Sequence, residues 1–450
     1  MRKLKKRRKK ARRALLAAIA AGSFLWGMVA LDGALNQSFD NPGSNWSTTT
    51  LGDALLNEWI GTTDTENNAE NMPLGNFLKT FPTWLAETTH MPFLHPEVEL
   101  EDAYFSTPST FQESGGGTQS PLLSSIANWQ SVSHKIALGW MPAESTYESD
   151  MLIKDNPGMN VVSPSWLELQ NASGQVSSQV NPAVIQYAHQ HHVQVWALFD
   201  NQFLANMTHQ FLSSKASEMR CIQQLVQIAK QNQLNGINLD FENLDDSDQS
   251  AYTTFVARLH KNLQAIHVDL SVDVTADIVP LVDNSAYFHA GLADVSDQLI
   301  LMAYDEHWAA DPTPGPVADM PWVKSCVNDL LDTGVPADKL LLGIPMYTRF
   351  WTVVNGQAVN SEAVGLDSVA SILAEHQAKS EYQPSLDLMY AQYPVNGGTE
   401  EVWYANQQTF SDKLQLVNND GLAGVAVWSL PFSQPSIWTS MINNLQKVVT

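Results

Sequence analysis

Residues 235–242 place two carboxyl groups and a carboxamide at alternate positions of one short segment. Side chains alternate between the two faces of a β-strand, so Asn238, Asp240 and Glu242 would share one face, and the apolar residues between them would share the other. Carboxyl groups gathered in this way can give and accept protons, which is the chemistry of general acid–base catalysis. The segment is therefore predicted to be a strand that carries a catalytic pair at its C-terminal end.

The elements that must position this pair alternate between short apolar runs and helical patterns. Apolar residues recur at three- and four-residue steps in segments 222–229, 252–266 and 323–330, as expected of amphipathic helices. Eight strand candidates accompany them, and eight strands alternating with helices predict a (β/α)₈ barrel, whose active site lies at the C-terminal ends of its strands. The strand candidates are residues 135–140, 159–166, 193–201, 235–242, 270–275, 297–305, 340–351 and 421–428.

Four of these runs resemble, in order, motifs of glycoside hydrolase family 18. NGINLDFE resembles the fourth-strand signature DGxDxDxE, and the run ending in MAYD resembles the sixth-strand motif MxYD. GIPMYTRFW resembles the seventh-strand pattern GxPxYxRxW, and GLAGVAVW resembles the eighth strand, which ends in tryptophan. The segments AYDEHW and EVWYANQQTFSDKLQLV resemble the bacterial spore-cortex and cell-wall N-acetylglucosaminidase branch, and the third-strand SxGG signature is absent from residues 193–201.

The resemblance implies a retaining hydrolysis in which the 2-acetamido group of the substrate is the nucleophile, without metal or organic cofactor. Glu242 would protonate the leaving oxygen and then activate water, Asp240 would orient the acetamide N–H, and Tyr304 would bind the acetamide carbonyl. The glycan would contain N-acetylglucosamine, with peptidoglycan as the first choice. Further substrate contacts are implied for Asn238, Asp305, Tyr347 and Arg349, with Trp428 as the floor under the reacting sugar.

Two positions of the fourth-strand signature are amides in this chain. Asn235 has the outward parity, where we expect it to affect packing or loop hydrogen bonding. Asn238 has the inward parity, where its amide can hydrogen-bond Asp240, and where it removes a like charge, so Asp240 is expected to ionise without that repulsion. Two alternatives remain at this stage: hydrolysis of chitin or another N-acetylglucosamine polymer, and a non-catalytic glycan-binding barrel.

The first 31 residues read as an export segment. Ten of the first 13 residues are Lys or Arg, and residues 14–31 are apolar or small. This pattern predicts a signal peptide or, more favoured, an uncleaved membrane anchor with a cytoplasmic N-terminus and an extracellular or cell-wall enzyme. Residues 32–128 are expected to be a partly ordered linker, and residues 129–450 the barrel, with a small insertion at about 352–400 that contains a helix and strands.

The net charge limits the possible partners, and the cysteines and histidines have structural interpretations. Removing the ten basic residues of the N-terminus leaves 14 bases against 47 acids, a formal charge of −33 on residues 14–450, which argues against nucleic acid as a partner. The two cysteines, Cys221 and Cys326, are expected to be buried free thiols. His189, His191 and His192 could bind a metal, but a solvated helix end is the favoured interpretation because no cysteine or carboxylate supplements them at ligand spacing.

Overall fold

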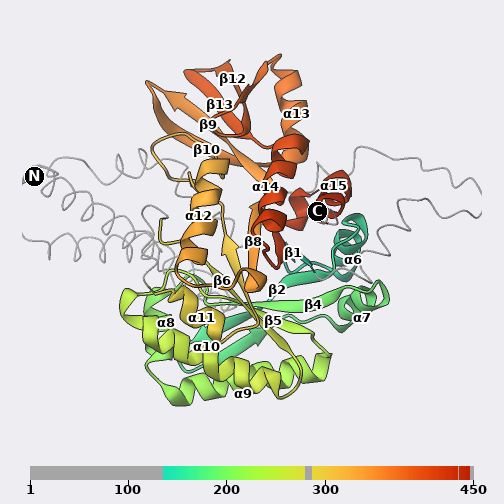
Figure 1. The fold of residues 1–450 in the computed structure, drawn as a ribbon, viewed down its shortest axis with the longest axis vertical. Coiled ribbons are helices and arrows are strands. Elements are labelled where there is room, and N and C mark those ends of the chain that lie inside the picture. Colours follow the sequence, from blue (N-terminus) through green and yellow to red (C-terminus); the bar gives the residue numbers. More distant parts are fainter. Residues whose placement is uncertain (1–134, 279–285, 434, 446–450) are drawn as a thin grey trace, which may run out of the picture. The chain divides into compact units, whose positions relative to one another are not determined.

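Eight parallel strands close into a barrel in the computed structural model, which describes residues 135–278, 286–433 and 435–445 (Figure 1). Their order around the barrel follows the sequence, and the first strand pairs with both the second and the last. The predicted (β/α)₈ barrel is confirmed, whereas the predicted export segment and linker lie outside the described residues. The strands are β1 (Ile136–Met141), β2 (Val161–Asn171), β4 (Gln194–Asp200), β5 (Gly236–Asp240), β6 (Asp269–Val274), β7 (Gln298–Met302), β8 (Leu340–Pro345) and β14 (Gly424–Trp428).

Helices alternate with these strands, and several begin at side chains that cap their free N–H groups. Ser145 and Glu148 form a reciprocal capping box at the start of α6. Asn181 and Asp319 accept backbone N–H groups at the starts of α7 and α12. The helices are α6 (Thr146–Asp155), α7 (Pro182–Gln190), α8 (Ala205–Leu212), α9 (Lys215–Asn232), α10 (Gln249–Gln264), α11 (His289–Asp294), α12 (Met320–Asp332), α14 (Gln407–Asn419) and α15 (Pro435–Leu445). No helix in the described part of the chain combines the length and apolarity needed to cross a membrane.

The outward face of β5 is packed against helices, as the alternation of its residues predicts. The ring of Phe241 lies 5.9 Å from that of Phe255 on α10 and 6.3 Å from that of Phe211 on α8, measured between centroids. Ile237 and Leu239 are fully buried on the same face. Burial of these side chains against the helices fixes the register of the strand and so directs its polar residues into the barrel.

A second sheet is inserted between β8 and β14. The run 340–351, expected to be one strand, is broken: β8 ends at Pro345, whose nitrogen cannot donate to a ladder, and the N–H of Met346 donates to Trp428 O at 2.7 Å. The chain then enters a five-stranded antiparallel sheet, so Tyr347 and Arg349 lie on the insertion and not on the barrel strand. This sheet comprises β9 (Tyr347–Val354), β10 (Gln357–Gly365), β11 (Ser380–Gln383), β12 (Leu388–Val395) and β13 (Gly398–Tyr404), with α13 (Leu366–Glu375) after β10; the remaining strand, β3 (Gln175–Ser178), forms a hairpin with β2.

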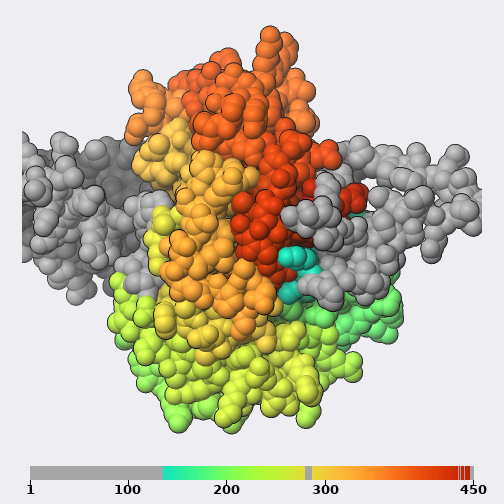
Figure 2. Space-filling view, viewed as in Figure 1, coloured from blue at the N-terminus to red at the C-terminus, as the bar shows by residue number. Residues whose placement is uncertain are grey.

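Side-chain and main-chain bonds tie the inserted sheet to the loops of the barrel. Trp351 Nε1 donates to Gly315 O at 2.8 Å, and Ala358 N donates to Pro312 O at 3.0 Å. In Figure 2 the insertion, in orange, lies directly against the yellow and red segments that include α12 and α14. The insertion also has a small hydrophobic core of its own around Phe350 and Val402.

Both cysteines are buried free thiols, Cys221 on α9 and Cys326 on α12, as predicted from their positions on outer helices. Burial raises the pKa of both thiols. Because the thiolate is the reactive form, these side chains behave as small core residues.

Candidate active site

Glu242 lies just beyond the C-terminal end of β5 on a backbone that a neighbouring amide holds in place. Asn201 Nδ2 donates to Glu242 O at 2.8 Å, and Glu242 N donates to Asn201 Oδ1 at 3.0 Å. Asn201 is itself buried and donates to Thr208 Oγ1 at 2.9 Å. The carboxyl group of Glu242 is therefore carried on a supported main chain. Asn201 was not foreseen, since a single Asn after a strand carries no recognisable signal.

The carboxyl group of Glu242 is surrounded by other acids. Burial raises its pKa well above the ordinary value, and the like charges of Asp240, Asp273, Asp305 and Asp200 raise it further. Such an environment favours the protonated form of the carboxyl group. Glu242 is partly exposed, so that proton is within reach of a ligand at the strand ends. The arrangement suits a general acid.

Asp240 is the last residue of β5 and is almost completely buried. Burial and then the charge of Asp200, its register partner on β4, raise the pKa of Asp240 to about 7. Asn238 removes the repulsion that an acid at position 238 would exert, but the carboxylate of Asp200 on the adjacent strand repels Asp240 instead. One oxygen, Oδ1, is buried without a hydrogen-bond partner among the described residues.

Asn238 lies one layer deeper and uses all of its hydrogen-bonding capacity within the barrel. Its oxygen accepts from Trp140 Nε1 at 2.7 Å and from Ser163 Oγ at 2.9 Å. Its nitrogen donates to Ser271 Oγ at 3.1 Å and to Asp273 Oδ1 at 2.7 Å. The side chain has no exposed surface and makes no hydrogen bond to the carboxyl two residues later. The hydrogen bond to that carboxyl, which the sequence allowed, is not formed, and the burial of Asn238 gives it the role of a support within the barrel.

Tyr304 and Asp305 follow β7 and face the same acids. Tyr304 is 5% exposed, and burial followed by the charges of Asp273 and Asp240 raises its pKa, so its hydroxyl keeps its proton. Asp305 adopts a left-handed backbone conformation with φ of 60°, which is uncommon for a residue other than glycine and occurs often at functional sites.

The inserted sheet supplies the partners of Asp305. Tyr347 donates its hydroxyl to Asp305 Oδ1, and the nearby charge of Arg349 lowers the pKa of Asp305, although burial outweighs it and the pKa remains raised. Arg349 is buried and donates through Nη1 to Ser361 Oγ at 3.3 Å. Both side chains reach the site from β9, so the insertion completes the wall beside β7.

Trp428, the last residue of β14, closes the other side of this constellation. Its ring meets that of Trp140 edge to face, with centroids 5.9 Å apart and an interplanar angle of 62°. Trp140 in turn donates to Asn238, so Trp428 is linked to the base of the site through one intervening ring. The peptide bond from Trp428 to Ser429 is cis. Trp428 is partly exposed, which leaves an aromatic surface available to a ligand.

Asn235 and the histidine cluster have structural partners away from Asp240 and Glu242. Asn235 Oδ1 accepts from Val195 N at 2.8 Å and bonds His189 Nε2 at 2.8 Å, as its outward parity predicts. The ring of His191 packs on that of Tyr187 with centroids 4.4 Å apart. These contacts account for two of the three histidines as supports of α7 and the neighbouring strands.

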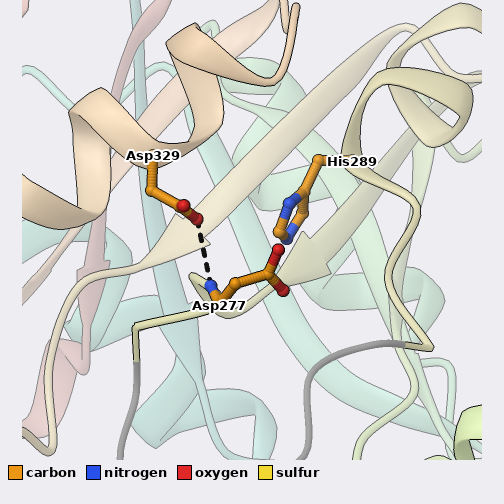
Figure 3. Close-up of side chains that lie close together, drawn as sticks. All are labelled: Asp277, His289 and Asp329. Atoms are coloured by element: carbon orange, nitrogen blue, oxygen red, sulfur yellow. Dashed lines mark hydrogen bonds between the residues drawn. The ribbon is translucent and has the colours of Figure 1, made fainter.

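A group of possible metal ligands lies apart from the acids that surround Glu242. Asp277, His289 and Asp329 bring one ligand atom each within 4.8 Å of one another (Figure 3). His289 Nε2 bonds Thr275 O at 2.8 Å, and Asp329 Oδ2 accepts the N–H of Asp277 at 3.0 Å. These bonds connect the end of β6 to α11 and α12, which explains the convergence of the three side chains structurally.

A closed parallel barrel with a carboxyl of raised pKa among further acids at its strand ends is the arrangement of an acid–base enzyme of the (β/α)₈ class. The family model "Glycosyl hydrolases family 18" matches residues 144–432, which is more than half of the chain. The chain therefore belongs to glycosyl hydrolases family 18 and is a glycoside hydrolase.

Two curated relatives agree with this assignment, and a solved structure shares the fold. The chain is 26% identical over 308 residues to "Uncharacterized glycosylase YvbX" of Bacillus subtilis (strain 168), an alignment that covers 66% of this chain and 88% of that protein. It is 22% identical over 255 residues to "Cortical fragment-lytic enzyme" of Bacillus cereus, covering 54% of this chain and 57% of the relative. The fold matches a chitinase from Chromobacterium violaceum with a TM-score of 0.63 at 22% identity, covering 70% of this chain and 99% of the other.

Proposed function

We propose that this chain is a retaining, substrate-assisted hydrolase of β-N-acetylglucosaminyl bonds in bacterial peptidoglycan. The observation that carries the proposal is the position of Glu242, a partly exposed carboxyl with a raised pKa at the end of β5. Asp240, buried beside it with a raised pKa, and the protonated hydroxyl of Tyr304 complete the groups that the chemistry requires.

The catalytic cycle assigns one task to each of these groups. Glu242 gives its proton to the leaving glycosidic oxygen while the acetamide oxygen of the substrate attacks the anomeric carbon. Asp240, as the carboxylate, accepts the acetamide N–H and stabilises the positive charge of the oxazolinium intermediate. Tyr304 donates to the acetamide carbonyl oxygen and holds it under the anomeric carbon. Glu242 then accepts a proton from the water that opens the intermediate, which regenerates the starting state.

Trp428, Tyr347, Arg349 and Asp305 would bind the sugars. The aromatic face of Trp428 suits the apolar underside of the reacting ring, and the polar groups of the β9 wall suit hydroxyl and acetamide groups of neighbouring sugars.

Peptidoglycan is preferred over other N-acetylglucosamine polymers on two grounds. One relative carries the name of a cortical fragment-lytic enzyme, and the strand motifs follow the cell-wall branch and lack the SxGG signature. Chitin is the alternative substrate within the same chemistry. A non-catalytic glycan-binding barrel is less well supported, because Glu242 is present and has the environment of an acid.

Mass spectrometry of muropeptides released from purified cell wall tests the proposal. New reducing ends at N-acetylglucosamine are expected with the wild type and not with Glu242→Gln, and chitin oligosaccharides digested in parallel should be cleaved more slowly. Reducing ends at N-acetylmuramic acid, or faster cleavage of chitin, would contradict the substrate assignment. Absence of turnover on both materials would favour the binding barrel.

We also propose that the enzyme acts outside the cell on a membrane anchor formed by residues 14–31. The basic residues followed by an apolar stretch support export with the N-terminus inside. Expression of the full chain in bacteria, followed by protease treatment of intact cells and mass determination of the membrane-bound fragment, tests this. Retention of residues 1–31 in the membrane with loss of the barrel is expected. A soluble protein lacking residues 1–31 would show a cleaved signal instead.

A further inference from the structure

A buried amide–carboxyl pair, Asn238 on β5 and Asp273 on β6, joins these two strands next to Asp240. Asn238 Nδ2 donates to Asp273 Oδ1 at 2.7 Å, and the two side chains are 0% and 1% exposed. Trp140 Nε1 can only donate, so the amide oxygen must face Trp140 and the amide nitrogen must face Asp273. The direction of the bond between Asn238 and Asp273 is thereby fixed.

This direction decides where Asp273 can hold a proton. Its Oδ1 must accept from the amide, which leaves Oδ2 as the oxygen that can carry hydrogen. Asn238 is opposite Ser271 in the parallel register, so Asp240 and Asp273 occupy the next inward positions of adjacent strands, which run about 4.8 Å apart. Asp240 Oδ1 is buried and has no hydrogen-bond partner among the described residues. A proton on Asp273 Oδ2 would supply one.

Two ionised carboxylates at this spacing and depth would be costly, because burial and mutual repulsion both disfavour the second charge. Burial, followed by the charge of Asp240, raises the pKa of Asp273 well above its ordinary value, and the bond from Asn238 offsets this only in part. The pKa of Asp240 is about 7. The titratable groups that face this pair from the surrounding elements are Asp200 on β4, Glu242 after β5, Tyr252 on α10, Tyr287 before α11 and Tyr304 after β7.

We propose that Asp273 is a positioning residue for Asp240: it stays a neutral carboxylic acid whose O–H donates to the ionised Asp240, while Asn238 holds its other oxygen. No proton is transferred in this arrangement, since the O–H bond remains on Asp273 and the charge remains on Asp240. In this chain the amide of the pair stands on β5 and the carboxyl on β6. The inference rests on the proposed function for the role of Asp240, whereas the protonation of Asp273 does not depend on it.

Infrared difference spectroscopy tests the protonation without any substrate. Asp273→Asn is nearly isosteric and keeps an oxygen that accepts from Asn238. The wild type at pH 7 is expected to show a carboxylic acid C=O band that is absent from this variant. Identical spectra in the acid region would overturn the proposal.

Kinetics on a chromogenic N-acetylglucosamine oligosaccharide test the positioning. Asp273→Asn replaces the O–H donor by N–H, so kcat/KM should stay within about threefold and the acid limb of the pH profile should not move. Asp273→Leu lacks any donor and should lose about tenfold or more. Ser271→Ala removes the other acceptor of the Asn238 amide without touching the donor and is the matched control. An acid limb that moves down by about one pH unit in Asp273→Asn would mean that Asp273 is ionised, and would overturn the proposal.

The arrangement can be tested by exchanging the two side chains. Asn238→Asp places two acceptors against each other and draws the proton of Asp273 to the oxygen that faces residue 238, away from Asp240; a loss of about tenfold or more in kcat/KM is expected. Adding Asp273→Asn turns the amide nitrogen of residue 273 toward the acceptor at position 238 and its oxygen toward Asp240, so no donor returns to Asp240 and most of the loss should remain. A double variant with wild-type kcat/KM would overturn the proposal. If the wild type turns over no such substrate, the proposed function fails, and the infrared result still decides the state of Asp273.

Discussion

Two layers of the inward face of β5 differ in how completely their polar atoms are bonded. In the deeper layer Asn238 has two donors on its oxygen and two acceptors on its nitrogen. In the layer at the strand end, Asp240 has a buried oxygen that finds no hydrogen-bond partner within the described part of the chain, and both Asp240 and Glu242 have raised pKa values. The satisfied layer holds the geometry, and the unsatisfied layer stores electrostatic free energy that is available to chemistry.

Among the substitutions that distinguish the two layers, Glu242→Gln is expected to have the largest effect. This change removes the proton donor at the strand end and nothing below it, so kcat should fall on the order of 10²-fold or more while glycan affinity persists. Turnover and equilibrium binding of a chitin oligosaccharide measure both quantities. Wild-type turnover in the variant would show that the acid lies elsewhere.

The next largest effects are expected from Asp240→Asn and Tyr304→Phe, because both residues are proposed to bind the acetamide group of the substrate. Both variants should slow hydrolysis, on the order of 10²-fold for the aspartate and less for the tyrosine. A thiazoline that mimics the oxazolinium should inhibit the wild type and bind both variants more weakly. An active wild type that the thiazoline does not inhibit would require a nucleophile from the protein.

The same substitution at Asp240 should have the opposite effect on stability. The folded-state pKa of about 7 lies above the ordinary 3.8, so the stability that the protonated carboxyl contributes is complete below about pH 4 and is lost as the pH rises through 7. Relative to Asp240→Asn, the wild type should lose up to about 1.4 kcal/mol of unfolding free energy per pH unit in that window. Denaturant unfolding at pH 5 and pH 8 measures the difference, with the exposed Asp338→Asn as the control. A difference in unfolding free energy between the two proteins that does not change with pH would contradict the raised pKa of Asp240.

The smallest effect is expected on the outward face. Asn235→Ala removes the acceptor of Val195 N and the partner of His189, at a cost of about 1–2 kcal/mol in unfolding free energy. Because the side chain at position 235 points away from Asp240 and Glu242, kcat and its pH profile should not change. A shift of the acid limb in this variant would mean that the two faces of β5 are electrostatically coupled.

Strand periodicity was sufficient to predict the barrel and the inward direction of Asp240, because the alternation is local and the buried Phe241 enforces it. It could not identify the partners of Asn238, which come from other strands. Asp200 and Asp273 were not foreseen for the same reason: each is a single acid at the end of its own strand, and only closure of the barrel brings them beside β5. The departure of the chain from the barrel at Pro345 was missed because the apolar pattern continues across the proline into β9.

The burial of both thiols gives the chain a practical property. The sequence contains two cysteines, and both are shielded and have raised pKa values, so thiol-directed reagents should react slowly with the folded protein. A cysteine introduced at Val359 on β10, which is 54% exposed, would then label selectively without removal of the native ones. Because the same sheet carries Tyr347 and Arg349, a fluorophore at that position would report whether the inserted sheet moves when a glycan binds.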